Sequence, residues 1–127
     1  MNPKTAAETY RQSSIENAPP VQIVRLLYEG ALRYIDRAAA SDPQTDFRAF
    51  ADWVGRADAI VTELRVSLEH EPAPEVAKGL DRVYEYAQHQ FGQAIVRRDL
   101  QPLADARKAL ATLLEGWRQI ELTTIGA

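Results

Sequence analysis

The segment DFRAFADWVGRADAIVTELRVSLE, residues 46–69, decides the fold. Its apolar residues recur in alternating steps of three and four along the chain. They are Phe47, Phe50, Val54, Ala57, Val61, Leu64 and Leu68. This spacing places all of them on one face of an α-helix, the pattern of a helix packed in a bundle. The segment therefore predicts a long amphipathic helix, with Asp46 as its N-cap.

Breaks that contain proline separate this segment from three others. They lie at residues 18–20, 41–43 and 71–74, with a weaker one at 99–102. Proline lacks an amide proton and clashes with the preceding turn, so it starts helices and ends the ones before it. The breaks predict further helices at residues 20–40, 75–98 and 102–122.

Each of these three segments carries its own apolar stripe. In the first, the stripe is Val24, Leu27, Ala31, Tyr34 and Ala38. In the last, it is Leu103, Ala106, Leu110, Leu113, Trp117 and Ile120. The middle one is less regular, with Val76, Leu80, Val83 and Ala87 followed by Phe91, Ala94 and Ile95. The shift by one residue after Ala87 predicts a local change in the buried face.

The connections between these segments are short, which favours antiparallel neighbours. The sequence therefore predicts an all-α fold, an antiparallel up-down-up-down four-helix bundle. We expect a single domain over residues 1–127, with the four long helices in 19–122 and a loosely packed lead, with a short helical start, in 1–18. A chain of 127 residues is long enough to build a core without disulfides or metals.

Composition excludes several classes of protein. The chain has no cysteine, so disulfides and thiolate metal sites are excluded. The formal net charge is −3 and no basic stripe is present, which argues against a nucleic-acid partner. No apolar run approaches the roughly 20 residues of a membrane span, and the N-terminus lacks the apolar core of a secretory signal. These features predict a cytoplasmic protein with no membrane insertion.

Residues that could carry chemistry are few. The two histidines, His70 and His89, lie in different segments, and neither has a glutamate three residues before it, as di-iron sites in helical bundles require. Asp58 lies beside the apolar stripe and is interpreted as a polar edge residue, not as a catalytic acid. No glycine-rich loop is present to hold a phosphate. We therefore expect no metal, no cofactor and no catalytic residue, and the chain is not predicted to be an enzyme.

The first long segment has more apolar residues than one face needs. Beyond its stripe it carries Ile23, Leu26, Tyr28, Leu32 and Ile35. A surface helix of a bundle buries a stripe a little over about 100° wide, so this surplus requires another cover. The candidates are the N-terminal lead, anchored by Tyr10 and Ile15, a second copy of the chain, or a foreign segment.

Gly30 lies inside the same predicted helix. Glycine in a helix costs about 0.5–1 kcal/mol relative to alanine, so a compensating benefit is expected. That benefit is the close approach of another backbone, either from a binding partner or from a neighbouring helix of the bundle.

Several motifs together resemble those of a known family. YRQSSIENAPP occupies residues 10–20, and LLYEGA follows at residues 26–31. This order of a tyrosine, a polar spacer, a proline helix start and a Leu-Tyr-Glu-Gly core is similar to the opening of the flagellin export chaperone family FliS. The VYEY motif at residues 83–86, residues 94–99 and Trp117 fall at the spacing of the same family. The resemblance runs without gaps from Tyr10 to Trp117.

The resemblance implies a function. Members of the FliS family are antiparallel helical bundles of the bacterial cytoplasm that bind the disordered C-terminal segment of flagellin. They block its premature polymerisation and deliver it to the flagellar type III export gate. On this basis we expect a flagellin segment and the export gate as partners, and a partner-binding site formed by Tyr10, Ile23, Leu26, Leu27, Tyr28 and Gly30. The alternative is a self-associating adaptor bundle, a homodimer without a flagellin client.

Three positions or pairs depart from the family pattern. Pro19 replaces a serine or threonine that would cap the first long helix. The pair His89-Gln90 stands where paired arginines are common, and Ile95 stands where asparagine is common. These departures indicate a divergent member and leave open which polar contacts the third long helix makes.

Overall fold

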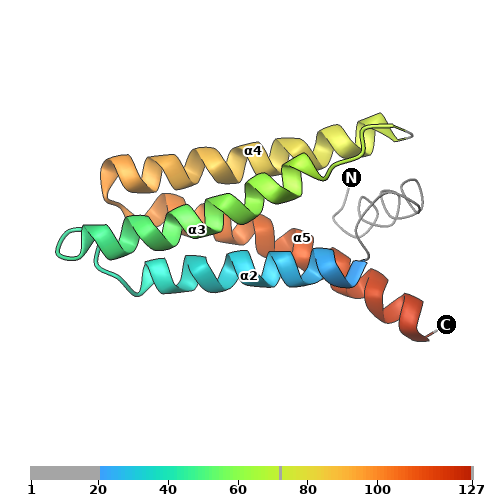
Figure 1. Ribbon diagram of the computed structural model, residues 1–127, viewed down its shortest axis with the longest axis horizontal. Helices are drawn as coiled ribbons and strands as arrows, with labels where there is room; N and C mark the ends of the chain where they lie inside the picture. The colour runs from blue at the N-terminus through green and yellow to red at the C-terminus, as the bar shows by residue number, and fades with distance from the viewer. Residues whose placement is uncertain (1–20, 72, 127) are drawn as a thin grey trace.

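The computed structural model describes residues 21–71 and 73–126, and their side chains as far as residue 123. The described residues form four α-helices, which are α2 (Val21–Ala39), α3 (Phe47–Val66), α4 (Pro74–Arg97) and α5 (Leu100–Gly126). Successive helices run in opposite directions (Figure 1). The predicted all-α antiparallel bundle is therefore confirmed. The predicted lead at residues 1–18, with Tyr10 and Ile15 in it, lies outside the described residues, as does Pro19.

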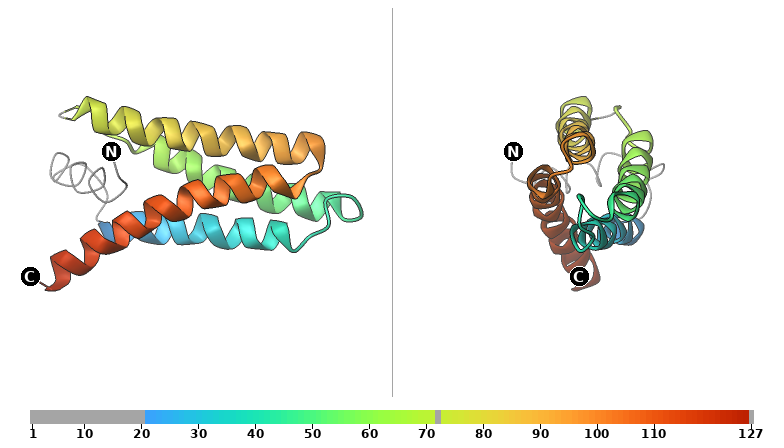
Figure 2. Two further views of the ribbon diagram at one scale, coloured as in Figure 1. Left: turned by 180° about the vertical axis from the view of Figure 1, so that it is seen from behind. Right: turned by 90° about the vertical axis from the view of Figure 1, so that its left-hand side faces the viewer.

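The helices pack as a closed ring. Helix α2 packs on α3, α3 on α4, α4 on α5, and α5 returns to α2. Figure 2 shows this arrangement from behind and along the bundle, with the C-terminal end of α5 running past the start of α2. Each helix thus has two main neighbours, and four seams between helices separate the core from the outside.

Two helix starts differ from their predicted form. Asp46 stands at the N-cap of α3, but its side chain makes no capping hydrogen bond, so this prediction is wrong. Asp42 orders the turn instead, because its Oδ1 accepts the amide of Gln44 at 2.8 Å, and this hydrogen bond lowers the pKa of the Asp42 carboxyl. Helix α5 begins at Leu100, two residues before the predicted start at Pro102. Pro102 lies in its first turn, where a missing amide proton costs nothing.

The connection between α4 and α5 is the shortest in the bundle. Only Arg98 and Asp99 lie between the two helices. Arg98 adopts a left-handed conformation with φ 51°, and its amide donates to the carbonyls of Ala94 and Ile95. Its guanidinium lies 4.0 Å from the ring centroid of Phe47 in α3. This two-residue link is enough to reverse the direction of the chain between the two helices.

The residues buried in the core confirm two of the four predicted apolar stripes, those of α3 and α5. In α3 the buried members are Phe50, Val54, Ala57, Val61 and Leu64. In α5 all the predicted positions from Leu103 to Ile120 are buried. Phe47 and Leu68, at the ends of the α3 stripe, are half-buried against the same core.

The stripes of α2 and α4 differ from prediction. The buried stripe of α2 is Val24, Tyr28, Ala31, Ile35 and Ala38, whereas Leu27 and Tyr34 are only half-buried. The buried stripe of α4 is Ala77, Leu80, Tyr84, Ala87, Phe91 and Ala94, an unbroken alternation of three and four. The predicted shift after Ala87 is therefore wrong, and Val83 and Ile95 pack at the edge of the core.

A pair of buried tyrosines explains both differences. Tyr28 of α2 and Tyr84 of α4 meet across the bundle, where their hydroxyl oxygens lie 2.5 Å apart and share a hydrogen bond. The Tyr28 ring also packs against the indole of Trp117 in α5, with 6.3 Å between ring centroids. A buried hydroxyl is costly without a hydrogen bond, so the bond that the two tyrosines share stabilises their contact. That pairing sets the rotation of α2 and of α4 about their own axes.

We predict that the two tyrosines are energetically coupled. Tyr28→Phe removes the shared hydrogen bond, so it should lower the free energy of unfolding by about 0.5–1.5 kcal/mol. The double replacement Tyr28→Phe/Tyr84→Phe should cost less than the sum of the two single replacements, because the shared hydrogen bond can be lost only once. Urea unfolding of the four proteins, followed by circular dichroism, measures the coupling. Additive effects would contradict it.

Candidate functional site

The seam between α2 and α5 is closed by ion pairs. Arg25 pairs with Glu121, Glu29 with Arg118 at 3.0 Å, and Asp36 with Arg107 at 2.7 Å. The hydrogen bond from Arg118 is the main reason that the pKa of the Glu29 carboxyl lies below its ordinary value. These pairs run along the outside of the bundle and cover the core between the two helices.

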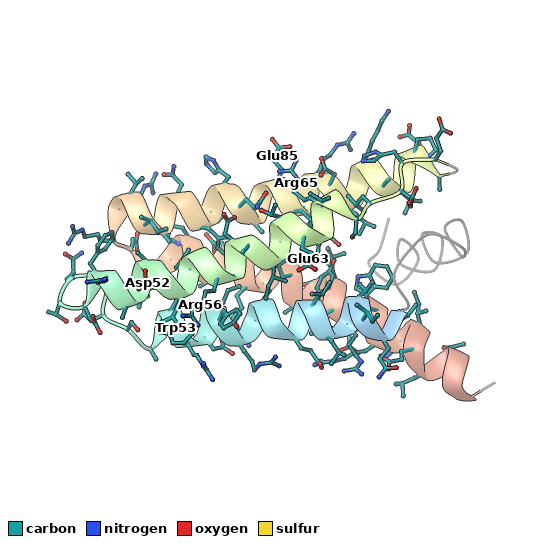
Figure 3. All side chains as sticks on the ribbon, viewed as in Figure 1. Asp52, Trp53, Arg56, Glu63, Arg65 and Glu85 are labelled. Carbon is teal, nitrogen blue, oxygen red and sulfur yellow. The ribbon has the colours of Figure 1, made fainter. Side chains whose placement is uncertain are left out.

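The seam between α3 and α4 is closed by a second polar ladder. Arg65 donates to both carboxylate oxygens of Asp81, at 2.7 and 3.1 Å, and to the amide oxygen of Gln88. Gln88 in turn donates to the carboxylate of Asp58 at 2.9 Å. Figure 3 labels Arg65 and Glu85 on this side of the molecule. The interpretation of Asp58 as a polar edge residue is confirmed by this contact.

The seam between α2 and α3 is closed by close packing and by aromatic stacking. A Cβ atom at Gly30 would lie 3.3 Å from Cδ1 of Ile60, so glycine lets these two helices approach closely. Further along the seam, the rings of Tyr34 and Trp53 stack with 5.8 Å between their centroids and 24° between their planes. Of the two explanations proposed for Gly30, the structure supports close approach of a neighbouring bundle helix.

The seam between α4 and α5 is open. A groove of about 810 Å³ lies there. Its apolar lining is Val76, Gly79, Leu80, Val83, Ala109 and Leu113. Its rim is formed by Glu75, Arg82, Tyr86, Asp105, Lys108 and Thr112. Among the described residues, the polar link between the two helices is the hydrogen bond from Gln90 to Asp105, which is long at 3.4 Å.

The groove exists because the tyrosine pair rotates α4. Tyr84 occupies the core position, which turns the neighbouring Val83 and Tyr86 toward the outside of the α4–α5 seam. Gly79 has nothing within 4 Å of where a Cβ would stand, so its missing side chain leaves the groove hollow. A groove with an apolar lining and with charged residues of both signs on its rim fits the apolar face of an amphipathic helix.

The described part of the chain offers no metal site and no membrane span. No group of three or more His, Asp or Glu side chains in residues 21–71 and 73–126 could hold a metal ion. None of the described helices is both long and apolar enough to cross a membrane. Among the described residues, no metal site lies beside the groove.

The model of the family described as flagellar protein FliS matches residues 2–124. The chain belongs to the FliS family. Similar proteins include the flagellar secretion chaperone FliS of Salmonella typhimurium, 29% identical over 118 residues that make up 92% of this chain and 87% of that protein. The flagellar secretion chaperone FliS of Vibrio cholerae is 28% identical over 117 residues, which cover 89% of this chain and 86% of that protein.

A third relative is covered to a similar extent. The flagellar secretion chaperone FliS of Bacillus subtilis is 27% identical over 118 residues, 93% of this chain and 85% of that protein. The resemblance drawn from the motifs is thereby confirmed. FliS is a family of chaperones and not of enzymes, which confirms the prediction that the chain is no enzyme.

The predicted site residues fall in three environments in this FliS-family chain. Ile23 and Leu26 are exposed on α2, by 46% and 48%. Leu27 is half-buried against the core, and Tyr28 and Gly30 are buried. Among the predicted site residues that the structure describes, Ile23 and Leu26 are thus the most exposed.

The surplus predicted for α2 is smaller than expected. Tyr28, Leu32 and Ile35 belong to the core and are not left over, so this part of the prediction is wrong. The groove between α4 and α5 was not predicted, because Val83 was assigned to the core stripe. The signal that could have located it is Tyr86, an aromatic residue off the stripe, together with Gly79 in mid-helix.

We predict that the close contact with Ile60 reduces the stability that alanine could add in place of Gly30. Alanine gains about 0.5–1 kcal/mol of helix propensity over glycine. Gly55→Ala in α3, where a Cβ meets nothing within 4 Å, should realise this gain in the free energy of unfolding. Gly30→Ala should gain less, since Ile60 must move aside. Equal stabilisation of the two variants in chemical denaturation would show that the close approach is unimportant.

We also predict an acid-sensitive contribution from Asp81. The hydrogen bonds from Arg65 lower the pKa of the Asp81 carboxyl in the folded protein. This carboxylate therefore stabilises the fold above about pH 4, the range of its unfolded pKa, and the stabilisation is lost as the pH falls through the lower folded pKa. Asp81→Asn should flatten the pH dependence of urea unfolding in that window. Identical pH profiles for wild type and Asp81→Asn would contradict this assignment.

Proposed function

We propose that this chain binds the C-terminal segment of flagellin, prevents its premature polymerisation and assists its passage into flagellar type III secretion in the bacterial cytoplasm. The coarser statement, a chaperone role in flagellar export, follows from membership of the FliS family. The observation that carries the finer proposal is the open apolar groove between α4 and α5.

The groove fits a helix that folds on binding. Val76, Leu80 and Val83 recur at steps of four and three along its α4 wall, which matches anchors at the same spacing on a partner helix. A disordered segment loses conformational freedom when it becomes helical, and burial of apolar area offsets that loss. Charged residues of both signs on the rim, such as Glu75 and Lys108, can pair with the polar face of the client.

The residues predicted on α2 extend this proposal to a second contact. Ile23 and Leu26 are proposed to touch the client directly, and Tyr10, from the lead, is proposed to act with them. Leu27, Tyr28 and Gly30 would support that surface from beneath through core packing. A client that contacts both α2 and the α4–α5 groove would have to wrap around the bundle.

The test is a binding titration of the purified chain with the C-terminal segment of its cognate flagellin. Calorimetry should give a dissociation constant of about 1 μM or tighter. Tyr86→Glu, in the groove lining, should weaken binding at least about tenfold, or about 1.4 kcal/mol. Val96→Glu is the matched control, on the same helix and 79% exposed outside the groove lining. Leu26→Asp tests the α2 contact in the same way.

Three outcomes separate the alternatives. Absence of a complex with the wild-type chain would contradict the proposed client. A complex that neither Tyr86→Glu nor Leu26→Asp weakens would contradict the proposed site while keeping the client. A stable dimer in light scattering, with no affinity for flagellin, would favour the self-associating bundle.

A further inference from the structure

Two arginines and two aromatic rings form a cluster at the far end of the α2–α3 seam from Ile23. We call it the Trp53 surface, and it consists of Tyr34 and Arg37 of α2 with Trp53 and Arg56 of α3. The Cζ atoms of Arg37 and Arg56 lie 5.0 and 4.8 Å from the centroid of the Trp53 ring. Figure 3 shows Trp53 and Arg56 on the side of α3 that faces α2. In the ring of helices, this seam lies opposite the α4–α5 groove.

Stacking leaves the hydrogen-bonding edges of these arginines available. A guanidinium that lies over an indole uses its flat face, and its N–H donors stay in the plane and point outward. Both arginines are exposed, and neither forms an ion pair within the described residues. Arg25, Arg65 and Arg107, which bridge helices as Arg37 does, do so through carboxylates instead.

The geometry restricts what can bind. Both guanidiniums lie within 5.0 Å of one ring centroid, so they are separated by no more than twice that distance. Each can hold a carboxylate through two parallel hydrogen bonds. On a helix, side chains four residues apart are neighbours with about 5–6 Å between their Cβ atoms, a spacing that two adjacent arginines can satisfy. The indole and the Tyr34 ring supply apolar contact between the two charged ends.

We infer that the Trp53 surface binds an acidic segment of a partner protein, with two carboxylates one helical turn apart. This inference does not depend on the flagellin proposal, because it concerns the opposite seam and other residues. Phosphate polymers fit less well. Their affinity comes from many simultaneous phosphate contacts, whereas this surface offers two unpaired cations and has Asp36 and Asp52 on the same two helices.

The test uses two synthetic helical peptides that differ only in charge. One carries two glutamates four residues apart, and the other carries glutamines in their place. Nuclear magnetic resonance of the labelled full chain should show that the glutamate peptide shifts the Trp53 indole N–H and the Nε–H signals of Arg37 and Arg56. The buried Trp117 serves as an internal reference that should not move. Raising the salt concentration tenfold should weaken binding about tenfold or more, because the contacts are exposed charges.

Substitutions distinguish stacked arginines from charge alone. Arg37→Gln/Arg56→Gln should abolish the shifts, and Arg37→Lys/Arg56→Lys should lose most of the affinity, since lysine keeps the charge but not the planar fork. Arg97→Gln, an exposed arginine at the end of α4, is the control and should bind as wild type does. Circular dichroism checks that each variant keeps the fold.

Several results would overturn the inference. These are equal binding of the glutamine peptide, full binding by the lysine variant, and shifts that fall on other residues. A short single-stranded oligonucleotide that shifts the same signals more strongly than the glutamate peptide would replace a protein partner with a nucleic acid.

Discussion

Two tyrosine hydroxyls are buried at the centre of this bundle, on helices that do not follow each other in sequence. Tyr28 and Tyr84 satisfy each other across the core, and Trp117 packs against them. Because hydroxyls cannot be buried without hydrogen bonds at reasonable cost, this pair fixes how α2 and α4 are turned. The rotation of these two helices determines which of their side chains face outward. Val83 and Tyr86 line the groove, and Tyr34 reaches Trp53.

The same pair shows where sequence reasoning reaches its limit. The α3 and α5 stripes could be predicted because each helix has only one apolar series with the correct spacing. Helix α2 has two series that fit equally well, one through Leu27 and Tyr34 and one through Tyr28 and Ile35. Local periodicity cannot choose between them, because the deciding partner, Tyr84, lies 56 residues away. The exposed residues Ile23 and Leu26 could be located from the sequence. The groove could not be predicted, because it depends on how α4 is rotated about its axis.

The four seams are closed by different chemistry, and this uneven closure creates the candidate surfaces. Carboxylate–arginine pairs seal α2 against α5, and a ladder through Arg65 and Gln88 seals α3 against α4. The α2–α3 seam is held by the fit of Gly30 to Ile60 and by stacked rings. The α4–α5 seam has no comparable seal among the described residues and stays open over an apolar floor. Membership of the FliS family assigns the chain a role in flagellar export, and the proposed client would bind in this groove.

The short link at Arg98 and Asp99 has a mechanical consequence for that floor. It joins α4 to α5 like a pivot, and Arg98 is anchored there by its backbone hydrogen bonds and its contact with Phe47. When two rods are pinned at one end, a small change of angle displaces their free ends most. The α4 wall of the groove runs from Glu75 to Tyr86, away from the pivot, whereas its α5 wall runs from Asp105 to Leu113, in the half of α5 nearest the pivot. A change of angle at the link would therefore displace Glu75 more than Tyr86 and leave the pinned end of the bundle nearly in place.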